Sequence, residues 1–175
     1  LDEAYLDVTK PKQGPPSATL IAREIRAEIQ EASGLTASAG VSYNKFLAKT
    51  ASDVDKPDGL TVIRPEDAAE FIAGLAIERF RGVGPVTAEK MHELGIHTGE
   101  DLRGMDVEQL RRHFGKSGAH FYRIVRGKDD RPVVTDRERK SVGAERTFAT
   151  NARTLEKLNR RLEPIPERGA RRRSD

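Results

Sequence analysis

The stretch LDEAYLDVT, residues 1–9, places two adjacent carboxylates ahead of an alternating segment. Apolar residues occupy every second position from Ala4 to Val8, and this period of two predicts a half-buried strand. Carboxylates such as Asp2 and Glu3 at a strand end suit a hard cation like Mg²⁺, which prefers oxygen ligands. Strict alternation sends neighbouring side chains to opposite faces, so both reach one metal only where the chain turns. The alternative is a solvated strand end without chemistry.

The composition indicates a polar chain with room for one domain or two small ones. It has 175 residues, of which 34% are charged and 5% are aromatic. It has no cysteine, which excludes disulfides and thiolate metal sites and is consistent with a reducing cytoplasm. No apolar run is long enough to cross a membrane, so we expect a cytoplasmic protein without a membrane partner.

Positive charge is concentrated toward the end of the chain. Residues 137–173 contain 12 Lys and Arg against 5 Asp and Glu, a local excess of +7, whereas the whole chain carries +3. The remaining residues therefore carry −4. This asymmetry predicts a polyanionic partner contacted mainly by one part of the chain. For residues 166–175 we favour a different interpretation, a disordered basic tail.

The first 63 residues predict an α/β layer. A helix is expected between Ser17, a potential N-cap, and Gly34, a C-terminal stop. The small-residue segment 36–42, where Gly40 indicates close backbone approach, predicts a strand, as does 60–63. A short helix is expected at 44–54. It is followed by Lys56 and a Pro-Asp-Gly turn, where the alternative for the lysine is an exposed turn residue.

From Pro65 onward the pattern predicts helices only, the first beginning at Pro65 itself. Residues 80–96 read FRGVGPVTAEKMHELGI, a Gly-apolar-Gly turn followed by a helix. Glycine lets the backbone come close to a phosphate, and helix N-terminal amides favour an anion. Such contacts read no bases, so they hold DNA of any sequence. The alternative is an ordinary helical hairpin. Further helices are expected at 98–104, 106–114, 116–126 and 154–162, and the four histidines have no metal spacing.

Taken together, these motifs resemble those of the Y-family DNA polymerases of the DNA polymerase IV type. The matching features are the Asp-Glu strand, the Lys56 turn, a helix-hairpin-helix at 80–96, and KSVGAERTF at 140–148. The resemblance implies an α+β fold, in which a partial palm with a mixed sheet and helices precedes an all-helical thumb. It implies a palm remainder (1–64), thumb (65–128), linker (129–139) and truncated start of a β-containing little finger (140–175), whose tail at 164–175 is expected to be disordered. We therefore expect a fragment that lacks upstream palm and fingers sequence.

The resemblance also implies a function and its residues. The reaction is error-prone, translesion synthesis in DNA repair: nucleotidyl transfer from a deoxynucleoside triphosphate to a primer, using two Mg²⁺ ions. Asp2 would bridge both ions as a catalytic ligand, Glu3 would bind the ion that activates the primer hydroxyl, and Lys56 would contact the triphosphate. The implied grips on primer-template DNA are Gly82, Val83, Gly84, Ser141, Arg146 and Thr147.

The chain holds two of the three catalytic carboxylates of the family, so we expect the fragment to be inactive by itself. The alternative from another class is a non-catalytic helix-hairpin-helix module that binds DNA. We expect a monomer, and any contact with a sliding clamp would use sequence outside this chain. A nuclease or ligase would explain the hairpin but not the Lys56 turn beside the acidic pair.

Overall fold

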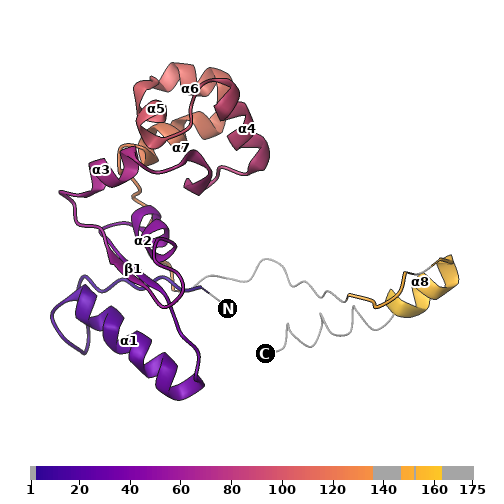
Figure 1. Cartoon of the computed structure of the whole chain (residues 1–175), viewed down its shortest axis with the longest axis horizontal. Coiled ribbons are helices and arrows are strands. Elements are labelled where there is room, and N and C mark those ends of the chain that lie inside the picture. Colours follow the sequence, from indigo (N-terminus) through magenta and orange to yellow (C-terminus); the bar gives the residue numbers. More distant parts are fainter. Residues whose placement is uncertain (1–2, 136–146, 152, 163–175) are drawn as a thin grey trace. The chain divides into compact units, whose positions relative to one another are not determined.

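The computed structural model describes residues 3–135, 147–151 and 153–162. The chain forms two compact units, Leu1–Val133 and Val134–Asp175. In the first unit, α1, β1 and α2 lie together, and the helices α4 to α7 form a separate group joined to them through α3 (Figure 1). The expected combination of a small sheet with a helical region is therefore confirmed, and the fold class is α+β. The four-part division into palm, thumb, linker and little finger stays a prediction.

Helix α1, Ala18–Ser33, confirms the first expected helix. Ser17 occupies the N-cap position without a side-chain capping bond, and Gly34 ends the helix in the left-handed conformation with φ 70°. The Gly34 amide donates a hydrogen bond to the Gln30 carbonyl, at 2.8 Å, so the C-terminal stop works as its sequence predicts. Helix α1 contacts both strands of the sheet, yet none of its residues is fully buried.

The sheet consists of two parallel strands, β1 (Ala39–Val41) and β2 (Leu60–Val62), with Gly40 paired to Thr61. Helix α2, Lys45–Ser52, connects them, as parallel strands require. A Cβ at Gly40 would lie 2.0 Å from the Ala48 carbonyl oxygen of α2. The predicted close backbone approach at Gly40 is confirmed, because only glycine lets this helix lie so close to the strand.

The strand expected over residues 1–9 is wrong for its described part. Residues 3–8 have no regular secondary structure, and the ladder of the described residues consists of β1 and β2 alone. The contacts of this segment with the rest of the unit are made by side chains, such as the Glu3–Lys49 ion pair at 2.7 Å, and its Thr9 amide donates locally to the Asp7 carboxylate at 3.0 Å. A strand is stabilised by a paired neighbour, and alternation in one segment cannot supply that neighbour.

The second half of this unit is all-helical, as predicted. The helix expected from Pro65 begins instead at Ala68, because residues 65–67 form a turn in which the Asp67 amide bonds to the Arg64 carbonyl at 3.1 Å. The helical elements are α3 (Ala68–Ala73), the 3₁₀ turn η1 (Ile77–Arg79), α4 (Pro85–Glu93), α5 (Gly99–Gly104), α6 (Val107–Phe114) and α7 (Lys116–Ile124).

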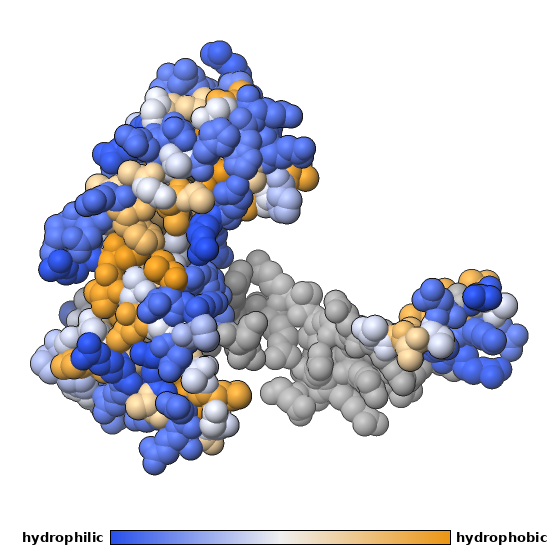
Figure 2. Space-filling model, viewed as in Figure 1, coloured by the Kyte–Doolittle hydropathy of each residue, from blue (hydrophilic) through white to orange (hydrophobic). Residues whose placement is uncertain are grey.

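One hydrophobic core joins α2 to the helices that follow β2. The rings of Phe46 in α2 and Phe80 after η1 lie 5.6 Å apart between centroids. Phe114 and Phe121 meet edge to face at 5.6 Å, which packs α6 on α7. Hydrophilic residues cover most of the visible surface of the α4 to α7 group (Figure 2). The core also contains Leu47, Ile63, Ile72, Ile77, Met91, Leu102, Leu110 and Ile124.

The described part of the second unit contains α8, Leu155–Leu162, which confirms the helix expected at 154–162. Its Arg161 donates a hydrogen bond to the Thr150 hydroxyl at 2.9 Å and lies over the Phe148 ring. None of the α8 residues is buried. Among the residues that the structure describes, no helix combines the length and the apolar composition needed to cross a membrane.

Candidate functional site

The predicted Gly-Val-Gly turn forms the hairpin that leads into α4. The Val83 amide donates to the Phe80 carbonyl at 3.0 Å, which closes the turn, and Gly82 has φ +89°. This positive φ favours glycine. Gly84 is the N-cap of α4 and Pro85 is its first residue, so the helix begins where the sequence predicts.

The N-terminus of α4 is open toward the surface. A Cβ added at Gly84 would meet no atom within 4 Å, and Val86 in the first turn is 81% exposed. The first turn contains no acidic residue, so the positive end of the helix dipole is not offset by a carboxylate of its own helix. The first amides of a helix have no partner inside it. The hairpin therefore offers backbone donors and open space to an anion.

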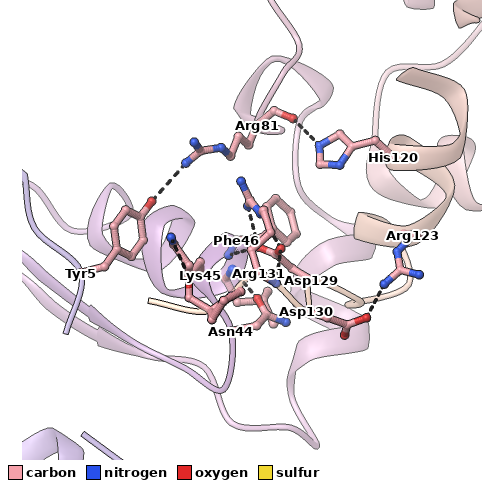
Figure 3. Close-up of polar contacts among 12 residues, drawn as sticks. Tyr5, Asn44, Lys45, Phe46, Arg81, His120, Arg123, Asp129, Asp130 and Arg131 are labelled. Atoms are coloured by element: carbon pink, nitrogen blue, oxygen red, sulfur yellow. Dashed lines mark hydrogen bonds and ion pairs between the residues drawn. The ribbon is translucent and has the colours of Figure 1, made fainter. Parts of the chain in front are cut away.

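Helix α7 contacts this hairpin through His120. The Nε2 atom of His120 lies 3.3 Å from the Arg81 carbonyl oxygen, and the His120 ring lies 3.8 Å from the position of a Cβ on Gly82 (Figure 3). The spacing of the histidines in the sequence predicted no role for His120. A histidine pattern could not reveal this contact, because it depends on the packing of α7 against the turn.

The acidic stretch is described from Glu3 onward, and Asp2 lies outside the described residues. The Glu3 carboxylate pairs with the Lys49 ammonium of α2 at 2.7 Å. The hydrogen bond with Glu3 raises the pKa of Lys49, helped by Asp53 and opposed by desolvation. Glu3 is therefore held by a lysine of α2 for which the sequence pattern predicted no role.

Lys56 lies at the other end of the same series of ion pairs. Lys49 also contacts Asp53 at 3.3 Å, and Asp53 contacts Lys56 at 2.6 Å. Desolvation acts to raise the pKa of Asp53, but the hydrogen bonds and charges of Lys56 and Lys49 outweigh it and lower that pKa. The structure thus connects Glu3 to Lys56 through alternating charges, Glu3, Lys49, Asp53 and Lys56.

The described carboxylates fit a divalent cation only in part. Carboxylate oxygens are suitable donors for Mg²⁺. However, no group of three acidic or histidine side chains within residues 3–135, 147–151 and 153–162 is arranged to hold a metal. Glu3 is the described member of the predicted pair, and its carboxylate is engaged by Lys49. The described residues therefore do not form a complete metal site by themselves.

Tyr5 lies between two cations that come from different elements (Figure 3). The Arg81 guanidinium donates to the Tyr5 hydroxyl at 3.3 Å, and the Lys45 ammonium lies 4.8 Å from the centre of the Tyr5 ring. Partial burial, followed by repulsion from Glu3, raises the pKa of Tyr5 against the opposing charges of Arg81 and Lys49. The hairpin and the first turn of α2 therefore meet at this tyrosine.

The segment after α7 is hydrogen-bonded across the start of α2. Asn44 caps α2 through its Oδ1 atom and donates its Nδ2 hydrogen to the Gly127 carbonyl at 2.9 Å. The Asp129 carboxylate accepts from the Phe46 amide at 2.9 Å and receives two bonds from Arg131, each 2.6 Å long. The segment predicted as a linker thus begins with an ordered attachment to α2.

The remaining residues predicted to contact DNA, Ser141, Arg146 and Thr147, belong to the second unit. Thr147 is described and exposed, whereas Ser141 and Arg146 lie outside the described residues.

Comparison with known proteins defines the class of this chain. The model of the impB/mucB/samB family matches residues 1–53, and the model of the DNA polymerase-iota thumb domain matches residues 79–129. A solved Y-family DNA polymerase chimera superimposes with a TM-score of 0.75 at 32% identity, over 86% of this chain and 44% of that one. DinB from Sulfolobus solfataricus gives a TM-score of 0.60 at the same identity and coverage. The chain belongs to the Y family of DNA polymerases.

Within this family the chain is similar to bacterial proteins named DNA polymerase IV. It is 55% identical to DNA polymerase IV 2 of Agrobacterium fabrum over 96% of this chain and 47% of that protein. It is 57% identical to DNA polymerase IV of Akkermansia muciniphila over 95% of this chain and 46% of that protein. The chain thus spans about half the length of these curated relatives.

Proposed function

We propose that the chain serves DNA-directed DNA synthesis of the translesion type, as part of the site that joins a deoxynucleoside triphosphate to a primer. Support comes from the names of its relatives and from the ion-pair series that connects Glu3 with Lys56. In this proposal Asp2 and Glu3 are the catalytic carboxylates, and Mg²⁺ is the metal that they help to hold. Lys56 offsets charge on the triphosphate, since an ammonium on a long stem suits phosphate binding.

DNA binding is the part of this proposal that the described residues support best. The hairpin of Gly82, Val83 and Gly84 would hold primer-strand phosphates through backbone amides. Ser141, Arg146 and Thr147 would contact the template strand. We place the protein in the cytoplasm as a monomer, bound to primer-template DNA. The single observation that carries the DNA-binding part of the proposal is the open helix N-terminus at Gly84, where an added Cβ would meet nothing within 4 Å.

The experiment that tests DNA binding compares two glycine substitutions. Gly84→Ala should fold normally, because its φ of −90° is allowed for alanine and the space is empty. It should weaken duplex binding, because the new methyl group lies between the amides and a phosphate. Gly104→Ala is the matched control, since a Cβ there also meets nothing within 4 Å. Equal duplex affinity of both variants in a fluorescence-anisotropy titration would contradict the proposal.

A second candidate function is a non-catalytic DNA-binding module. The observation that favours it is the Glu3–Lys49 pair, which engages the described carboxylate, while the hairpin is fully formed. Such a module would bind primer-template DNA with an affinity that falls with salt, and it would not extend the primer.

A further inference from the structure

Five cations lie along the acidic stretch, helix α2 and the segments beside them, and they differ in what they contact. Lys49, Lys56 and Arg131 each form an ion pair with a carboxylate. Within the described part of the chain, Lys45 and Arg81 form no ion pair. Their contacts are uncharged: the Pro132 carbonyl and the Tyr5 ring for Lys45, and the Tyr5 hydroxyl for Arg81. Two positive charges at this place are therefore not balanced by a described carboxylate.

Both cations are held in position by several elements. Lys45 is the first residue of α2, and its ammonium donates to the Pro132 carbonyl at 3.3 Å. The Arg81 carbonyl is contacted by His120, and its guanidinium by Tyr5. Long basic side chains on a surface normally lose rotamer freedom when they bind a ligand. Here the contacts with Tyr5 and with the Pro132 carbonyl orient the two side chains before a ligand binds, which favours a binding role over a freely solvated one.

The two cations lie between the proposed phosphate site and the acidic stretch. Arg81 directly precedes the Gly82-Val83-Gly84 hairpin, and Tyr5 is two residues from Glu3. Arg81 and Lys45 reach the same tyrosine, from the hairpin and from α2 respectively (Figure 3). A DNA strand held at the hairpin and directed toward Glu3 would bring its neighbouring phosphates past these side chains.

We propose that Lys45 and Arg81 form a second phosphate-binding site, which takes a backbone phosphodiester of the primer strand between the α4 hairpin and the acidic stretch. Tyr5 acts as a positioning residue that holds the two cations apart and facing the same space. This inference rests on the proposed DNA-binding function and adds two residues to it. The contact is to phosphate alone, so it is independent of base sequence.

The test is the salt dependence of duplex binding by the full chain. The logarithm of a binding constant falls linearly with the logarithm of salt concentration, with a slope of about −0.9 for each phosphate neutralised. Lys45→Gln with Arg81→Gln should reduce the magnitude of this slope by about 1 and weaken binding to all sequences equally. The matched control is Lys12→Gln with Arg23→Gln, which removes the same two charges from exposed positions of the same unit.

The possible results distinguish a failure of this inference from a failure of the proposed DNA-binding function. An unchanged slope in the Lys45 and Arg81 double variant, or a change equal to that of the control, overturns the second site even if wild-type protein binds DNA and Gly84→Ala weakens it. Wild-type protein that shows no salt-dependent binding overturns the proposed function itself. If the double variant does not fold, Arg81→Gln alone decides the matter: it should reduce the slope more than the single control Arg23→Gln does. Equal slopes for these two single variants overturn the second site.

Discussion

The Asp129 carboxylate lies 2.9 Å from the backbone nitrogen of Phe46 and accepts its hydrogen bond, although the two residues are 83 positions apart. The Asp129 side chain is only 3% exposed, and Arg131 binds it through two nitrogens. A buried carboxylate is stable only when it is paired and hydrogen-bonded. This residue therefore attaches the chain that leaves α7 to the first turn of α2.

Replacing Asp129 should destabilise the first unit, and the loss of stability should grow with the number of its hydrogen bonds and ion pairs that the substitution removes. Asp129→Ala leaves the Phe46 amide without its acceptor and Arg131 without its partner, and should lower the free energy of unfolding by about 2–4 kcal/mol. Asp129→Asn keeps an acceptor oxygen and should cost about half as much. Urea denaturation measures both. The neighbouring Asp130→Asn, 83% exposed, serves as control and should be neutral. Equal effects at 129 and 130 would contradict the attachment.

The same carboxylate should give stability a defined pH dependence. The hydrogen bond from Arg131 lowers the pKa of Asp129 in the folded protein despite desolvation. A lowered pKa contributes stability that is complete above the unfolded value of about 3.9 and is lost as pH falls through the folded value. The difference in melting temperature between wild type and Asp129→Asn should be constant from about pH 7 to 5 and shrink below about pH 4. A difference that grows in acid would refute this.

Gly40 should be irreplaceable for packing rather than for backbone conformation. An added Cβ would lie 2.0 Å from the Ala48 carbonyl oxygen and 2.4 Å from the Ser52 nitrogen, both atoms of the α2 backbone. Helix α2 cannot move away without breaking its contact with the sheet. Gly40→Ala should therefore lose about 2–5 kcal/mol of stability. Gly74→Ala, whose nearest neighbour would be 3.9 Å away, is the control, and similar denaturation midpoints for the two would contradict the explanation.

Local signals predicted the elements of this fold well, and non-local contacts explain what they missed. Gly34 ended α1, and Thr98 began α5 in a capping box with Asp101, because caps depend on residues within one turn. The strand of residues 1–9 failed because pairing needs a partner elsewhere in the chain. The Asp129 attachment could not be predicted for the same reason, since its segment has no apolar periodicity.

The sequence predicted which residues belong to the candidate site better than it predicted which residues contact them. The prediction of the Gly82 to Gly84 hairpin depended only on local sequence, and in the structure the hairpin precedes the start of α4. The partners of Glu3 and Lys56 were not foreseen, because Lys49 and Asp53 look like ordinary polar residues of an amphipathic helix. Their role appears only when α2 is placed beside the acidic stretch.

Primer extension tests whether the 175 residues suffice for catalysis. We expect no extension by the chain alone in the presence of Mg²⁺, because two carboxylates of the expected three would hold the ions weakly and Lys49 engages one of them. The control is Asp2→Ala with Glu3→Ala, assayed on the same primer-template. Extension above this control would show that the chain carries a sufficient site, contrary to our expectation.

The Glu3–Lys49 pair should compete with a divalent cation for the carboxylate. Removing the ammonium, 2.7 Å from Glu3, takes away a positive charge that repels the cation and occupies its ligand. Both side chains are about a third or more exposed, so a water-like Coulomb energy of about 1 kcal/mol applies, which is about fivefold in affinity. Lys49→Gln should therefore bind Mn²⁺, a spectroscopic substitute for Mg²⁺, about fivefold more tightly in an electron paramagnetic resonance titration.

The matched control is Lys56→Gln, which removes the same charge from a lysine that contacts Asp53 and not Glu3, so it should change the Mn²⁺ affinity much less. Glu3→Gln in the Lys49→Gln background should abolish the gain. Equal Mn²⁺ affinity for the two lysine variants would show that Lys49 acts only through net charge and that Glu3 is not a cation ligand.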